Sequence, residues 1–164
     1  MLSLGPITAA HLGLERMLLE SPNFLRWSGA RTRPEARRRI KHYDYEDDPV
    51  RLIQERPFAV ILTPAQAVLT AVSWGNQVEF TPSGGISLIL TDRDDAGSER
   101  RAGYLRFAGW LDLILEDLRE RSAVEDRLPI SRIDLLWPIL HSPMKDEASA
   151  GAYWHVCVNL EIGK

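Results

Sequence analysis

Residues 153–162 read YWHVCVNLEI, and apolar and polar positions alternate along this stretch without a break. Successive side chains of a β-strand point to opposite faces, so a strand here has one face for a core and one for water or a partner. The sequence therefore predicts a half-buried sheet that the rest of the chain completes and covers. The apolar face consists of Trp154, Val156, Val158, Leu160 and Ile162, and the other face of Tyr153, His155, Cys157, Asn159 and Glu161.

The overall composition is that of an ordinary globular protein. With 164 residues, 45% of them hydrophobic and 26% charged, residues 1–164 are expected to form a single domain with its own core. The net charge of -3 is unlike that of a nucleic-acid binder. The single cysteine, Cys157, excludes an internal disulfide framework and a multi-cysteine zinc site.

The sequence also predicts where the protein is made. The first residues lack the basic and apolar regions of a signal peptide, and no run approaches the roughly 20 apolar residues that span a bilayer. The expected reduced state of Cys157 favours synthesis inside the cell. We therefore expect a protein made in the cytoplasm, with no membrane partner.

Two short helices are predicted near the N-terminus. Thr8 is a suitable N-cap for a helix that runs to about Glu20. Ser21-Pro22 then provides the cap and first residue of a second helix, which ends at Gly29. Helices this short are unstable alone, so both must pack on other elements. Their apolar residues are Ala10, Leu14, Met17, Leu18, Phe24 and Trp27.

A charged extended loop with a partly helical middle is predicted at about residues 30–49, where apolar residues become scarce. One interpretation is a surface loop whose opposite charges neutralise each other. Another is a docking arm for a neighbouring subunit. A nucleic-acid patch is disfavoured, because the adjacent carboxylates would repel phosphates. The basic block consists of Arg31, Arg33, Arg37, Arg38, Arg39 and Lys41, and the acidic block of Asp44, Glu46, Asp47 and Asp48.

The middle of the chain contains predicted strands and turns. Pro57–Leu62 is apolar, and a second extended piece covers Ala67–Trp74, with Gly75-Asn76 as a turn. A hairpin is predicted next, with its turn at Pro82-Ser83-Gly84-Gly85, because adjacent glycines permit the positive φ values of a tight reversal. Its tip is expected to project beyond the core.

The longest helix is predicted from about Glu99 to Arg121, and a strand follows at Ile130–Leu140, where Pro138 indicates an edge or a bend. This order of elements predicts an α+β fold, in which a mainly antiparallel sheet is packed by one long amphipathic helix, with short N-terminal helices. The helix stripe facing the core consists of Tyr104, Phe107, Leu111, Ile114 and Leu118, and the opposite side of Asp112, Glu116, Arg119 and Glu120.

Motifs for catalysis and metal binding are scarce. His42 beside the acidic block offers ligands for a hard cation, or carboxylates for a hydrolytic enzyme, but the same pattern is common in solvated loops. Cys157 and His155 neighbour each other on one strand face, but nothing in the chain indicates an oxyanion site or an orienting third group. We therefore expect no catalytic residue, no metal site and no cofactor.

From Thr8 to Gly163, the order of elements resembles that of the tail-terminator and head–tail connector (neck) proteins of tailed bacteriophages. The shared pieces are the N-terminal helix pair, a strand after a charged stretch, a glycine-turned hairpin (Phe80 to Ile86), the long amphipathic helix and the closing aromatic strand (Tyr153 to Ile162). The charged segment Ala30–Pro49 matches no motif of that family.

The resemblance implies a structural virion subunit without enzymatic activity. Such a tail terminator forms a ring, usually a hexamer, at the head-proximal end of the tail tube and joins it to the neck. The implied partners are copies of itself, the tail-tube protein and a neck or head-completion protein, with no sequence-specific nucleic acid. A head-closure or tail-completion protein, or an assembly adaptor that binds one partner, is the alternative.

Candidate subunit contacts follow from the needs of a ring. Head-to-tail contacts require two different, complementary surfaces on each subunit. Adjacent basic and acidic blocks supply complementary charge, and a projecting hairpin tip can pair with a neighbour's sheet. The candidate interface residues are Arg33, Arg37, Arg38, Arg39, Asp44, Asp47, Asp48, Ser83, Gly84 and Gly85.

Overall fold

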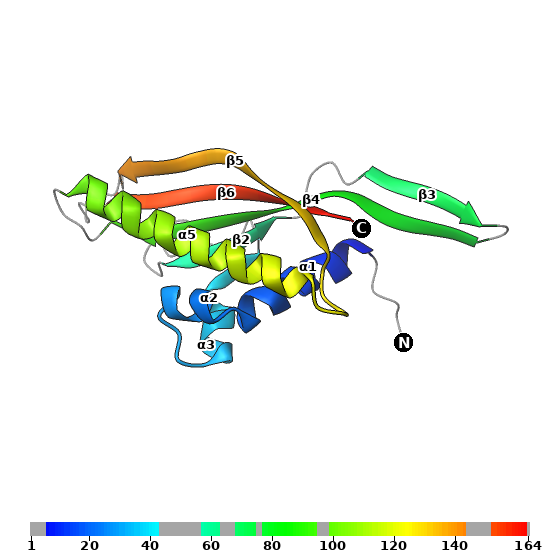
Figure 1. Cartoon of the computed structure of the whole chain (residues 1–164), viewed down its shortest axis with the longest axis horizontal. Helices are drawn as coiled ribbons and strands as arrows, with labels where there is room; N and C mark the ends of the chain where they lie inside the picture. Colours follow the sequence, from blue (N-terminus) through cyan, green and yellow to red (C-terminus); the bar gives the residue numbers. More distant parts are fainter. Residues whose placement is uncertain are drawn as a thin grey trace.

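Helices and one sheet form two layers in the computed structural model of the chain (Figure 1). The structure describes residues 6–42, 57–62, 68–74, 77–94, 99–143 and 152–163, and for the strand residues between 68 and 84 it describes the backbone alone. The elements are α1 (Pro6–Glu20), α2 (Pro22–Trp27), α3 (Arg33–Arg38), β1 (Ile40–His42), β2 (Phe58–Leu62), β3 (Val68–Trp74), β4 (Gln77–Arg93), α5 (Arg100–Ser122), β5 (Ile130–Pro143) and β6 (Ala152–Ile162).

The strand order of the main sheet is β1-β2-β4-β6-β5, and β3 pairs with β4 outside this path. The β1–β2 pair is parallel, whereas the other pairs are antiparallel. This arrangement confirms an α+β fold with a mainly antiparallel sheet. Strand β5 lies at the end of the strand order, and its register with β6 shifts on both sides of Trp137. Next to Pro138, the strand is thus both an edge and irregular, as predicted.

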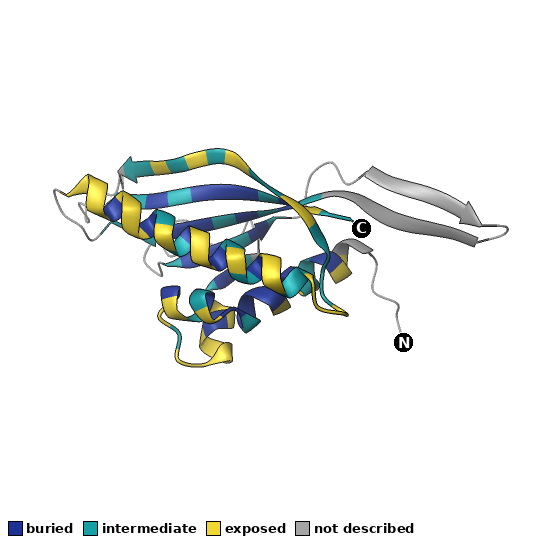
Figure 2. Cartoon of the chain, viewed as in Figure 1, coloured by how far each residue is buried: buried dark blue, intermediate teal, exposed yellow. Residues whose placement is uncertain are grey.

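The core lies between the sheet and the helices (Figure 2). The predicted apolar face of β6 is confirmed, with Val156, Val158 and Leu160 fully buried. The predicted stripe of α5 is confirmed from Phe107 to Leu118. Tyr104 is 43% exposed, because it lies at the margin of the contact, where its ring meets Trp154 edge-on at 5.9 Å between centroids.

The N-terminal helix pair has the predicted apolar face, although α1 begins at Pro6, ahead of the predicted cap Thr8. The Ser21 hydroxyl accepts a hydrogen bond from the backbone N–H of Phe24 at 2.9 Å, which confirms Ser21 as the N-cap of α2. Gly29 has a φ of +69°, and the N–H of Ala30 donates to the carbonyl of Leu25. This left-handed glycine ends α2 in a Schellman motif, as expected for a glycine after a helix.

The charged loop predicted at 30–49 contains a helix, α3, in agreement with its predicted partly helical middle, but the prediction of a loop is wrong for residues 40–42, which form strand β1. Two apolar residues explain the difference, because Ala36 is fully buried and Ile40 is 4% exposed. Burying them holds the charged segment against the core and adds β1 to the sheet beside β2. Residues 43–49 lie outside the described residues.

The predicted turn at 82–85 is also wrong, because β4 runs without interruption from Gln77 to Arg93. Ser83 pairs with Val68 of β3, and Gly84 pairs with Ile162 of β6, so β4 changes partner at this point. Gly85 serves close packing: a Cβ atom there would lie 1.9 Å from Oδ1 of Asn159. Gly85 thus lets the strand pass through a crowded part of the sheet, where the chain does not reverse.

The hairpin of this protein is β3–β4. Among the described strands, the outer part of β4 pairs with β3 alone, and its inner part pairs with β6 and β2. The resulting two-stranded ribbon extends beyond the helices and the rest of the sheet (Figure 1). Residues 75 and 76, the predicted turn between its strands, lie outside the described residues. A projecting hairpin is therefore present, made by a different pair of strands from the predicted one.

Candidate functional site

The short helix α3 forms because its first turn is capped. The hydroxyl of Thr32 accepts a hydrogen bond from the N–H of Glu35, and the Glu35 carboxylate accepts one from the N–H of Arg31 at 2.7 Å. The first bond satisfies an N–H group that a helix start leaves without a partner, and the second holds the residue before the cap against the first turn. The helix then places its arginines beside α1, against which it packs.

A cleft of about 860 Å³ lies between α1 and α3. Its floor is apolar, since Leu19 and Ile40 line it, and Leu12 at its side is 45% exposed. Four arginines against two glutamates give the lining a net charge of +2, in a protein whose overall charge is -3. We call this the arginine cleft; it is lined by Leu12, Glu15, Arg16, Leu19, Glu20, Arg33, Pro34, Arg37, Arg38 and Ile40.

The arginines of the cleft differ in how they are paired. Nε of Arg37 lies 2.9 Å from Oε1 of Glu15, and Nε of Arg16 lies 3.2 Å from Oε1 of Glu20. Arg33 and Arg38 are exposed, and in the described ranges no carboxylate lies within ion-pair distance of either. Their guanidinium groups therefore have donors available for an anionic ligand.

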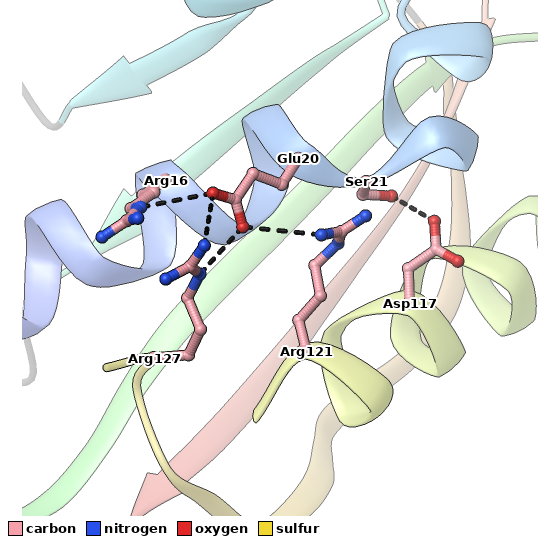
Figure 3. Close-up of polar contacts among 6 residues, drawn as sticks. All are labelled: Arg16, Glu20, Ser21, Asp117, Arg121 and Arg127. Atoms are coloured by element: carbon pink, nitrogen blue, oxygen red, sulfur yellow. Dashed lines mark hydrogen bonds and ion pairs between the residues drawn. The ribbon is translucent and has the colours of Figure 1, made fainter. Parts of the chain in front are cut away.

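Glu20 is the centre of a cluster at the end of the cleft (Figure 3). Arg127 donates to both oxygens of Glu20, each at 2.9 Å, and Arg16 and Arg121 also reach this carboxylate. The hydrogen bonds from Arg127 are the main cause of the lowered pKa of Glu20. Because Arg127 follows α5 in the chain, the cluster ties α1 to the far end of α5.

A second polar contact joins α2 to α5 beside this cluster (Figure 3). The Asp117 carboxylate accepts hydrogen bonds from the Ser21 hydroxyl at 2.5 Å and from the backbone and side-chain nitrogens of Asn23. A carboxylate at the N-terminus of α2 is also favoured by the helix dipole. These contacts hold the start of α2 against α5.

The structure brings together only some of the predicted interface residues. Arg33, Arg37 and Arg38 line the arginine cleft, and Arg39 lines a smaller pocket of about 330 Å³ next to Arg38. Ser83, Gly84 and Gly85 lie within β4, so their prediction as a hairpin tip is wrong. Asp44, Asp47 and Asp48 lie outside the described residues.

Sequence reasoning missed the α1 side of the cleft. The spacing of Glu15, Arg16, Leu19 and Glu20 along one helix was a signal for a charged face, because residues three and four apart are neighbours. No local signal pointed to Arg127, which lies 107 positions from Glu20 in the sequence.

The outer edge of β5 is a second surface of interest. Leu135 and Leu136 are each 55% exposed, and Leu140 is 40% exposed. In the part of the chain that the structure describes, no strand pairs with this side of β5. A long edge strand with exposed leucines is a template for pairing with another chain, and monomeric proteins usually protect such edges.

Cys157 is 1% exposed although it lies on the predicted polar face of β6. Burial raises the pKa of its thiol, and only a hydrogen bond with Ser87 acts in the opposite direction. His155, which is two residues away on the same strand, has its Nε2 3.0 Å from the hydroxyl of Ser142. The thiol is therefore held in its protonated form, which is the unreactive one.

We expect Cys157 to resist a soluble thiol reagent in the folded protein at neutral pH. The buried thiol with its raised pKa supplies little thiolate, so labelling should follow the unfolding transition. Labelling by a chromogenic disulfide reagent, with and without denaturant, measures this difference. Equal labelling rates under both conditions would contradict the burial of Cys157.

The described residues contain neither a metal-binding cluster nor a membrane-spanning helix. No group of three or more histidine, cysteine, aspartate or glutamate side chains there is arranged to hold a metal ion. Within the same ranges, none of the helices has the length and apolar character needed to cross a membrane.

Comparison with known proteins gives no family assignment. No family model matches the chain, and no curated protein matches its sequence.

Proposed function

We propose that this chain is a structural subunit that forms a ring with copies of itself, as the tail terminator of a tailed bacteriophage. The observation that carries the proposal is the outer edge of β5, which carries exposed leucines and which no strand of the described residues covers. Such an edge can extend into a neighbour's sheet through main-chain hydrogen bonds, with the leucines packed in the contact. A contact of this kind needs no catalytic residue.

The phage assignment is supported by the order of elements. The pair α1–α2, the long helix α5 and the closing strand β6 match the pieces of the resemblance. The glycine-turned hairpin is no longer one of these pieces, because β4 is continuous there, and the hairpin β3–β4 replaces it in the comparison. On this proposal, the protein acts in the virion, where its ring contacts the tail-tube protein on one side and a neck or head-completion protein on the other.

The arginine cleft favours a second candidate function, that of an assembly adaptor or a head-closure protein. A positive cleft with an apolar floor suits one acidic partner, held in a one-to-one complex. The stoichiometry of the purified complex separates this function from that of a ring subunit.

The ring is tested with purified protein, alone and mixed with tail tubes, by mass photometry and negative-stain microscopy. We expect closed rings, and we expect Leu136→Lys to abolish them without changing the melting temperature, because a charged side chain blocks edge pairing. Leu113→Lys is the matched control, since Leu113 is an exposed leucine on α5. A wild-type protein that remains monomeric beside its tubes, or that forms only a one-to-one complex, contradicts the proposal.

A further inference from the structure

We infer that the arginine cleft is the receiving half of the subunit contact and that it binds the acidic block, Asp44–Asp48, of a second copy. This inference rests on the proposed ring and names the chemistry of one contact within it. It starts from Arg33 and Arg38, which have no carboxylate partner among the described residues, and from the composition of the acidic block.

The cleft has the chemistry of a site for a carboxylate-bearing segment. Arg33 and Arg38 present exposed guanidinium groups at opposite ends of α3, and Arg37 between them is already paired with Glu15. Guanidinium groups bind carboxylates through two parallel hydrogen bonds, which gives such sites their specificity. Leu12 adds an exposed apolar contact at the side of the same cleft.

The acidic block has the complementary composition. Residues 43–48 read YDYEDD, so six consecutive residues contain four carboxylates and two tyrosines. Carboxylates suit Arg33 and Arg38, and tyrosine rings suit the apolar floor, since tyrosine combines an apolar body with a polar end. The charge of +2 at the cleft, in a protein of net charge -3, directs an acidic segment to this place.

A second copy is the occupant that the ring requires. In a head-to-tail ring, every subunit carries both halves of the contact on different surfaces. This chain carries both surfaces, the arginine cleft and the acidic block. Opposite charges across the contact would fix the register of the two subunits and speed their association. The competing arrangement, in which the block binds the cleft of its own copy, predicts different behaviour in a mixing experiment.

The experiment uses charge reversal in the full chain, read by sedimentation velocity. The cleft variant is Arg33→Glu with Arg38→Glu, the block variant is Asp47→Lys with Asp48→Lys, and the swap variant combines all four changes. We expect the cleft and block variants each to weaken self-association about tenfold or more, because like charges then face each other. The swap variant should recover the wild-type association.

Mixing distinguishes the second copy from the same copy. A cleft variant keeps its acidic block, and a block variant keeps its cleft. In an equal mixture the unchanged block therefore meets the unchanged cleft, and the reversed block meets the reversed cleft, so the mixture should associate although neither variant does so alone. A block that binds its own cleft gives no such association. The absence of association in the mixture, together with a swap variant that stays dissociated, overturns the inference.

A control separates these charges from charge in general. Arg100→Glu with Arg101→Glu makes the same change in net charge at exposed positions of α5 outside the cleft, and it should leave association unchanged. Circular dichroism checks the fold, and Arg33→Gln with Arg38→Gln replaces the cleft variant if the reversal unfolds α3. Wild-type rings with unaffected variants overturn this inference alone, whereas a wild-type protein that never associates overturns it together with the proposed function.

Discussion

Replacing Leu111 with alanine is expected to lower the free energy of unfolding by about 2–5 kcal/mol. Leu111 is 5% exposed on the inner face of α5, within the same core as Phe107, Ile114 and Leu118. Truncating its side chain loses the burial of the Cγ methine and its methyl groups and leaves a cavity that the close-packed neighbours only partly fill. Urea unfolding followed by circular dichroism measures the change.

Leu113→Ala provides the matched control, because it makes the same substitution two residues away on the same helix. Leu113 is 47% exposed, so its replacement should change stability by less than about 0.5 kcal/mol. Similar losses in the two variants would mean that the inner face of α5 has been assigned incorrectly.

Replacing Glu20 with glutamine is expected to cost about 2 kcal/mol at neutral pH, since hydrogen bonds to charged groups contribute more than neutral ones. The Glu20 side chain is 14% exposed and accepts hydrogen bonds from Arg127, which is 18% exposed. Glutamine keeps the shape of the side chain but removes the negative charge, so the surrounding guanidinium groups then repel one another without compensation. Chemical unfolding at neutral pH gives the size of the loss.

The same carboxylate predicts a pH dependence with a definite sign. The pKa of Glu20 is lower in the folded protein than its usual value of 4.5, so folding favours the ionised form. Its contribution to stability is fully present above about pH 4.5 and is lost as the pH falls through the lowered pKa. The difference in stability between the wild type and Glu20→Gln should therefore shrink in acid.

Glu116→Gln tests whether the Glu20 effect depends on burial. Glu116 also pairs with an arginine, Arg119, and its pKa is also lowered by that hydrogen bond, but both side chains are largely exposed. Exposed pairs contribute little, so this variant should melt like the wild type. If Glu116→Gln melts lower than Glu20→Gln, the importance assigned to the Glu20 cluster is wrong.

Periodicity predicted the elements that bury one face. The alternation in β6 and the three- and four-residue spacing in α5 match the structure, because each pattern is a direct consequence of burial on one side. The pair Gly84-Gly85 led to the wrong prediction of a turn, because glycine is compatible both with a turn and with a crowded strand. Only the position of Asn159, brought close by the pairing of β4 with β6, decides between the two.

The candidate site was predictable only in part. The arginine block was recognisable from composition, and three of its members line the cleft. The strand in this block and the packing of the block against the core were not recognisable from the sequence, because Ala36 and Ile40 are isolated apolar residues. Their burial depends on the helices and strands around them. Two partners of Glu20, Arg121 and Arg127, lie 101 and 107 positions away in the sequence, so their approach is a property of the tertiary structure alone.

Strand β4 belongs both to the projecting ribbon and to the centre of the sheet. A pull on the ribbon along this strand would load its backbone hydrogen bonds with β2 and β6 in shear, all at once, since those bonds run across the strand direction. Tension applied to the ribbon would thus be shared by many hydrogen bonds in the core, and the ribbon would resist being pulled away from the sheet.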